Sequence, residues 1–199
     1  MDNVYHQVRR GPRSHLLNKA VKILLILSGI FMFAGAMTMP IYAIFVEEIG
    51  GGITTASTSY ALFWLVAGIA TFFTGYIENK MKETELAIMW SQFILGIAYV
   101  MYFFTETVDT LYIVQILLGI GNAFYWPAFH STYSKHVQKK KSAEQWGIYD
   151  ALAYLVPAIA AALGGWLVEA YGFHSIFAIM AALSFFNGFF ILVLPRKVL

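Results

Sequence analysis

The sequence has no cysteine and few charged residues, and both shortages narrow what the protein can be. Without cysteine, the chain can form neither a disulfide framework nor a thiolate metal site. Charged residues make up 12% and hydrophobic residues 59% of its 199 residues, whereas a soluble chain is about 25% charged and about 45–50% apolar. The net charge of +2 is too small to indicate nucleic-acid binding. This composition indicates an integral membrane protein.

Basic residues are missing from every second gap between the long hydrophobic runs. Five precede the first run, two follow the second, four follow the fourth and two follow the last, and these are all 13 of the Lys and Arg residues. Lys and Arg stay on the cytoplasmic side during insertion. The alternation therefore predicts six crossings with both termini in the cytoplasm, and we expect a multi-pass protein of the cell (plasma or inner) membrane.

The lengths of the runs place the crossings, because a spanning helix needs roughly 20 apolar residues. We predict an all-α bundle over residues 23–194, preceded by a basic cytoplasmic segment at 1–22 and followed by a cytoplasmic tail at 195–199. The first run is longer than the h-region of a signal peptide, which is about 7–15 residues, so we expect it to be retained. The predicted helices are 23–46, 57–77, 86–104, 111–134, 146–168 and 175–194.

Small residues and prolines inside the runs predict helix contacts and bends. Helices in lipid associate by close backbone approach, which small residues permit. Residues 158–162 with Gly164 and Gly165 form the densest stretch of this kind, so we expect the fifth helix to pack tightly on a neighbour. Each proline inside a helix removes a backbone hydrogen bond and permits a kink; these prolines are Pro40, Pro127 and Pro157.

Several stretches resemble helices of the major facilitator superfamily. Residues 115–128 read Gln-Ile-Leu-Leu-Gly-Ile-Gly-Asn-Ala-Phe-Tyr-Trp-Pro-Ala, with the Gly-x-Gly and later Pro-Ala typical of that family's helix four. Glu-Gln-Trp-Gly at 144–147 and Gly-Gly-Trp-Leu-Val-Glu-Ala-Tyr-Gly-Phe at 164–173 resemble its helix five and the turn into helix six. Pro40, followed by an aliphatic-aromatic run and Glu-Ile-Gly-Gly, resembles its helix one. The resemblance implies two inverted three-helix repeats, which form one half of a twelve-helix fold.

Two positions depart from the family's pattern. Gln115 stands where many members, especially proton-driven exporters, have Arg. In the loop after the second helix, Asn79 and Lys80 replace an Asp-Arg pair and Lys82 replaces a glycine. Both departures disfavour proton antiport.

The resemblance also implies a function, because the family binds substrate between its two six-helix halves. We therefore expect a secondary transporter that works by alternating access as a parallel homodimer. Its expected partners are a second copy of the chain, the lipid bilayer and a small-molecule substrate, with no nucleic acid. We expect neither enzymatic activity nor a cofactor, since no metalloprotease, hydrolase or phosphate-binding motif occurs.

Other assemblies stay open at this point. The chain could be a non-transporting membrane subunit, one half of a hetero-complex, or a piece of a twelve-helix protein. The basic segment that begins at Met1 is an argument against the last alternative.

By family analogy, helices one and four line the substrate path with help from two and five. Gln115, Asn122 and Trp126 share one helical face, because they are spaced by seven and four residues. Asn122 lies near the bilayer midplane, where its amide either contacts substrate or bonds to another helix. The aromatic candidates either line the path or serve in packing and anchoring. The full set of candidates is Thr38, Tyr42, Tyr60, Trp64, Gln115, Asn122, Tyr125, Trp126, Tyr149 and Tyr154.

No run has a charged residue at its centre, and the ionisable groups inside the runs are Asp150 and His130. We interpret Asp150 first as part of a gating or structural salt bridge with His130, Lys135 or Lys80. The second interpretation is a proton-carrying carboxylate with His130 as relay partner, and the third is simple exposure to water. Without central charges, and with many aromatic rings, the path is expected to take an uncharged, amphipathic or organic-cation substrate.

Overall fold

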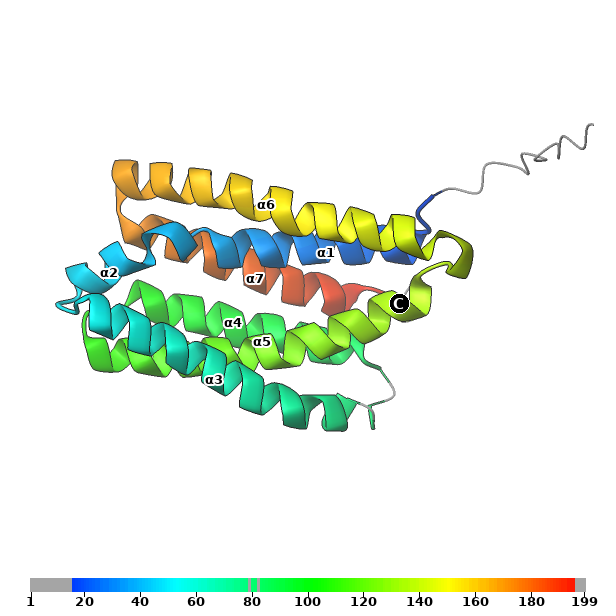
Figure 1. The fold of residues 1–199 in the computed structure, drawn as a ribbon, viewed down its shortest axis with the longest axis horizontal. Coiled ribbons are helices and arrows are strands. Elements are labelled where there is room, and N and C mark those ends of the chain that lie inside the picture. Colours follow the sequence, from blue (N-terminus) through cyan, green and yellow to red (C-terminus); the bar gives the residue numbers. More distant parts are fainter. Residues whose placement is uncertain (1–15, 79, 82, 196–199) are drawn as a thin grey trace, which may run out of the picture.

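The computed structural model describes residues 16–78, 80–81 and 83–195, and all regular elements in these ranges are helices (Figure 1). Six helical segments there are long and apolar enough to cross a membrane, which confirms the predicted number. The first segment comprises α1, η1 and α2, and the fifth comprises η2 and α6. The elements are α1 (Lys19–Ala36), η1 (Met39–Ile41), α2 (Tyr42–Glu48), α3 (Ile53–Glu78), α4 (Glu85–Phe103), α5 (Val108–His136), η2 (Lys139–Lys141), α6 (Ser142–Tyr171) and α7 (Phe173–Val193).

The packing of these helices follows the symmetry of two inverted repeats. The second crossing, α3, packs on the fourth, α5, just as the fifth, α6, packs on the first, α1. The contact of α4 with α5 likewise corresponds to that of α7 with α1, while α4 and α7 pack on each other. Exchanging the first three crossings with the last three therefore reproduces these contacts, as the 3+3 fold predicts, whereas the contact of α6 with α7 has no comparable counterpart between α3 and α4.

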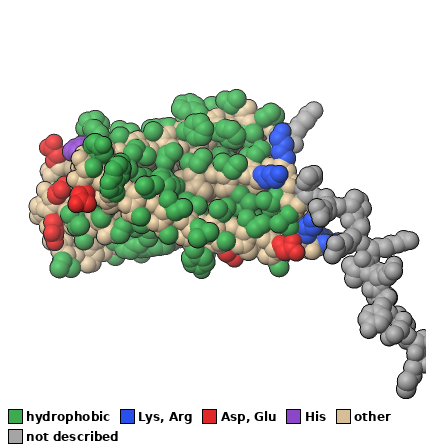
Figure 2. Space-filling model, turned by 90° about the horizontal axis from the view of Figure 1, so that it is seen from above, with side chains coloured by type: hydrophobic (Ala, Val, Ile, Leu, Met, Phe, Trp, Pro, Cys, Tyr) green, Lys and Arg blue, Asp and Glu red, His purple; other side chains and the backbone are tan. Residues whose placement is uncertain are grey.

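The bundle is flattened, and α6 and α3 form its two outer edges with the other helices between them (Figure 1). The described basic residues are Lys19, Lys22, Lys80, Lys135 and Lys139–Lys141. They lie where α1 and α6 begin and where α3 and α5 end. We call this the basic end, and the face in Figure 2 shows Lys and Arg side chains only there, with a largely hydrophobic surface between the two ends. The described C-terminus also lies at the basic end (Figure 1).

Pro40 interrupts the first crossing. α1 ends at Ala36, the chain passes through η1, and the helix resumes as α2. The interruption packs on α6 at Gly164, where an added Cβ would overlap the carbonyl oxygen of Met37. Ala160, one turn earlier, is fully buried. The fifth crossing therefore does pack tightly on a neighbour at Gly164, whereas a Cβ at Gly165 would meet open space.

Pro127 lies inside α5 without ending it. Because proline has no N–H, the carbonyl of Ala123, four residues earlier, lacks its helical donor. The hydroxyl of Thr74 on α3 donates to that carbonyl over 2.7 Å. Pro157 likewise lies inside α6. These helices accommodate their prolines, and the α3–α5 contact compensates for the bond lost at Pro127.

The contact at Gly164 generates a prediction. Gly164→Val should destabilise the bundle by about 1–3 kcal/mol or more, because the new side chain would push the backbone at Met37 away from α6. The measurement is the thermal unfolding midpoint in mild detergent. Gly165→Val makes the same change in helix propensity at an open position and serves as the matched control. Equal loss of stability in the two variants would contradict this account.

Candidate functional site

All of the candidate residues of the substrate path except Thr38 fall into three places in the structure. One group forms a polar network at the end opposite the basic end. A second group lies where α5 meets α1 and α6. The third group lies on the outer faces of α3 and α6.

Gln115 is the centre of the polar network. Its side chain is only 3% exposed, and its Nε2 donates to the hydroxyls of Tyr42, over 2.6 Å, and Tyr102, over 2.9 Å. The Tyr42 hydroxyl also pairs with the hydroxyl of Ser59 over 2.6 Å. The network joins α2, α3, α4 and α5. At the position where many family members have arginine, this chain thus has a neutral amide that needs no counter-charge. Ser59 and Tyr102 escaped the sequence analysis because no motif marks them.

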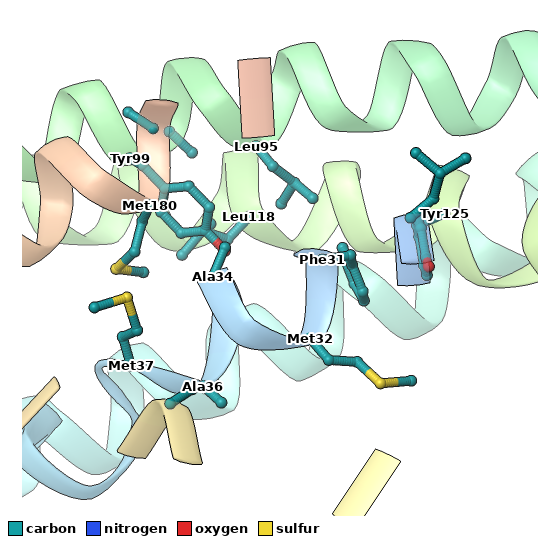
Figure 3. Close-up of a cluster of buried hydrophobic side chains, with 14 of the residues drawn as sticks. Phe31, Met32, Ala34, Ala36, Met37, Leu95, Tyr99, Leu118, Tyr125 and Met180 are labelled. Atoms are coloured by element: carbon teal, nitrogen blue, oxygen red, sulfur yellow. The ribbon is translucent and has the colours of Figure 1, made fainter. Parts of the chain in front are cut away.

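Tyr125 and Tyr149 belong to a buried stack of aromatic rings. Tyr125, Phe129 and Tyr133 occupy successive turns of α5, and neighbouring rings in this column lie 5.5 Å apart with nearly parallel planes. Phe31 of α1 stacks on Tyr125 at 3.6 Å between centroids (Figure 3), and Tyr149 of α6 stacks on Phe129 at 5.1 Å. The stack connects the first three crossings, through α1, with the last three, through α5 and α6. Its rings are buried in this conformation.

An open face lies beside this stack. Asn122, Trp126 and His130 follow one another at one-turn intervals on α5 and are all at least partly exposed. The ring of His130 lies 5.5 Å from Trp126 and 6.0 Å from Trp146 of α6, between centroids. The Asn122 amide donates back to the Leu118 carbonyl of its own helix over 2.9 Å. Because that bond stays within α5, it leaves this side of the helix open.

The remaining path candidates are divided between the surface and the core. Tyr60 and Trp64 on α3 are 40% and 58% exposed, and Tyr154 on α6 is 79% exposed. Thr38 is buried beside η1, and its hydroxyl lies 3.7 Å from the sulfur of Met180 on α7. The structure therefore brings Trp126 and His130 together on the open face, but places Thr38 away from it.

Asp150 is exposed and makes no hydrogen bond or ion pair with any residue that the structure describes. Its three proposed partners have other neighbours: the Lys80 ammonium lies 4.2 Å from the centre of the Tyr76 ring. Lys135 donates to the Thr84 hydroxyl over 3.2 Å, and His130 packs among aromatic rings. The predicted gating salt bridge is not formed in this conformation.

Glu78 is a buried carboxylate that the sequence analysis missed. It is the last residue of α3 and only 5% exposed. Its Oε1 has no hydrogen-bond partner in the described part of the chain. The predicted second helix ended at residue 77, which left Glu78 in the loop. Its position one turn after Thr74, on the same helical face, was the available signal.

No three His, Cys, Asp or Glu side chains converge into a possible metal site within the described ranges. The chemistry that these faces offer is binding by aromatic rings, amides and hydroxyls.

Comparison with known proteins agrees with this architecture. The family model "Major Facilitator Superfamily" matches residues 24–198. The MFS-type transporter YitZ of Bacillus subtilis is 26% identical over 158 residues, covering 78% of this chain and 94% of that protein. The multidrug resistance protein MdtG of Proteus mirabilis is also 26% identical, over 75% of this chain but 38% of its own length.

Among solved structures, the POT family transporter PepTSo superposes with a TM-score of 0.71 at 13% identity. The match covers 89% of this chain and 37% of PepTSo, so it reports the fold alone. The chain thus spans less than two fifths of PepTSo and of MdtG, but nearly all of YitZ. Since the family model spans nearly the whole sequence and the six-helix bundle has the family's fold, this chain belongs to the Major Facilitator Superfamily.

Proposed function

We propose that the protein is a secondary transporter that works as a parallel homodimer and carries an uncharged, amphipathic or cationic organic molecule by alternating access. The basic end faces the cytoplasm of the cell, so that both termini are cytoplasmic. Rocking of one protomer against the other exposes the path to either side of the membrane in turn.

The distribution of exposed polar groups carries this proposal. On α4 the exposed side chains within the span are Trp90, Ile97 and Val100, and those of α7 beyond its first turn are Ala178, Ala182, Phe186, Phe189, Phe190, Leu192 and Val193. All are apolar and suit lipid. The exposed side chains of α3, α5 and α6 include Tyr60, His130, Asp150 and Tyr154. Lipid tails cannot hydrogen-bond to such groups, whereas a second protomer and a water-filled path can.

A two-fold axis along the membrane normal follows from this distribution. α3 and α6 lie at opposite edges of the bundle, with α5 between them (Figure 1). An axis in front of the open face places α3 of one protomer against α6 of its partner, and α6 against α3. The two open faces then enclose one path, of which a single copy supplies only one wall.

The chemistry of the open face supports the substrate class. Trp126, His130 and Trp146 present rings near the basic end, and ring faces attract organic cations. Asp150 adds an exposed carboxylate on the neighbouring helix. The relative MdtG bears the name of a multidrug resistance protein, which is consistent with amphipathic substrates for this chain.

The proposed dimer can be tested by cross-linking, because the chain has no cysteine of its own. Leu65 and Leu155 lie halfway along α3 and α6 and are 60% and 62% exposed. Co-expressed Leu65→Cys and Leu155→Cys chains should form a disulfide-linked dimer in native membranes. Ile97→Cys and Phe186→Cys, on the exposed faces of α4 and α7, are the matched control pair and should remain monomeric. A strictly monomeric protein, or equal cross-linking of both pairs, would refute the dimer.

The substrate class can be tested through the open face. Trp126→Leu should weaken binding of tetraphenylphosphonium by about 0.5–2 kcal/mol, or roughly 2–30-fold in Kd, because the cation loses one ring face. The measurement is equilibrium binding to the purified protein, with uptake into proteoliposomes measured in parallel. Trp166→Leu, at the far end of α6, removes an exposed ring outside the open face and should leave Kd unchanged. Equal Kd values for Trp126→Leu and the unaltered protein would exclude Trp126 from the site.

A further inference from the structure

Glu78 is a carboxylate in an environment that does not stabilise its charge. Glu78 is only 5% exposed, and its buried Oε1 accepts no hydrogen bond. No hydrogen bond or ion pair of Glu78 is found among the residues described. Burying an ionised carboxylate without a partner costs far more than burying the neutral acid. Taking up a proton removes this cost.

The direction of the Glu78 side chain follows from its helix. Thr74 and Glu78 are four residues apart, so they share a face of α3. Thr74 donates to the Ala123 carbonyl of α5 over 2.7 Å, which fixes that face against α5. Glu78 is therefore buried where the last turn of α3 approaches the part of α5 that contains Pro127.

The charged and titratable groups that the structure describes around this end of α3 do not neutralise Glu78. On α3's own side, Lys80 lies over the Tyr76 ring. On α5, Lys135 donates to Thr84, and the Nδ1 of His136 lies 2.9 Å from the Thr132 carbonyl oxygen.

Three further ionisable groups belong to the elements that meet here. His130 of α5 packs on Trp126, and Glu83 and Glu85 stand before and at the start of α4. The last two are acidic and cannot neutralise a carboxylate.

We propose that Glu78 is a proton-binding site. It couples the packing of α3 on α5 to the pH of the solution that the basic end of the bundle faces. The neutral acid is the form compatible with the closed contact seen here. Loss of the proton to water leaves a carboxylate, which favours a conformation in which the end of α3 separates from α5 and Glu78 is hydrated or pairs with a lysine of the basic end. Because the two conformations bind the proton with different affinities, proton binding and helix packing are linked.

Gln115 and Asn79 replace the Arg and Asp of the family's pattern, and these replacements disfavour proton antiport. Glu78 is at neither position, so binding of a proton to Glu78 does not require the missing Arg or Asp. The inference deepens the proposed function, since α3 is also the helix that would meet the partner protomer. A proton that changes the packing of α3 would thereby change the rocking equilibrium. The proposal rests on the proposed transport activity for its biological role, but not for its physical test.

The test is a distance measurement that needs no substrate. Spin labels attached to Ile77→Cys on α3 and Ser134→Cys on α5, both exposed positions near the basic end, report the separation of the two helices by pulsed electron paramagnetic resonance. In reconstituted protein the separation should be shorter at acidic pH and longer at alkaline pH. Glu78→Gln, a neutral side chain of the same shape, should keep the short separation at both pH values.

Two further variants keep the test decisive. Glu144→Gln removes an exposed carboxylate in the first turn of α6, at the same end of the bundle, and should retain the full pH response. Glu78→Ala should abolish that response whether or not it preserves the short distance.

In infrared difference spectra between the two pH values, the protonated-carboxyl band should be smaller in Glu78→Gln by the contribution of one group.

The outcomes separate this inference from the proposed function. A separation that does not change with pH, or a pH response that survives in Glu78→Gln, overturns the proton site even if the protein transports. A pH response that depends on Glu78 in a protein that transports nothing supports the proton site and overturns the proposed transport.

Discussion

Close approach of helix backbones is the constraint on which the rest of this structure depends. Lipid tails are as apolar as the helices, so burial of apolar surface cannot drive helices together within the bilayer, and packing and hydrogen bonds must do so. Gly164 brings α6 onto the carbonyl of Met37, and Gly119 brings α5 onto α3, where an added Cβ would lie 2.9 Å from the Phe63 carbonyl oxygen. These two contacts join corresponding pairs of crossings in the two inverted repeats, the first with the fifth and the fourth with the second. They hold the outer helices α6 and α3 against the inner helices α1 and α5.

Hydrogen bonds between helices add to the stabilisation that close packing provides. The Thr74 hydroxyl serves the carbonyl that Pro127 leaves without a helical donor, and Gln115 connects hydroxyls from neighbouring helices. At the centre of the bundle, the Asn187 amide of α7 donates to the Leu27 carbonyl of α1 over 3.0 Å. In the described part of the chain, three buried oxygens have no hydrogen-bond partner: Glu78 Oε1, Asn187 Oδ1 and the Tyr125 hydroxyl. Glu78 is the carboxylate among them. An uncompensated carboxylate at a helix contact is the kind of group through which proton binding and conformation become linked.

The same helices serve stability and the proposed function. α4 and α7 present apolar surface outward and pack on each other, so they form the lipid-facing side of the bundle. α3, α5 and α6 present aromatic rings, hydroxyls and ionisable groups, and the second protomer we propose would cover them. α3 has a part in every step of this scheme: it packs on α5, it would meet the partner, and it ends at Glu78. A movement of α3 would therefore change both the proposed dimer interface and the shape of the proposed path.

The sequence by itself determined the number of crossings, the separation of basic residues to one end, the interruption at Pro40 and the family. These are set by hydrophobic length, charge placement and short motifs, which are local properties. Tertiary structure alone decided which side of each helix is covered. The helices are apolar almost all round, so periodicity could not predict that Gln115 is buried under Tyr42, that Tyr125 belongs to a core stack, or that Asp150 lacks its expected partner. The burial of Glu78 depended on one further residue of helix and on the rotation of α3 against α5, and only the packing of the whole bundle sets that rotation.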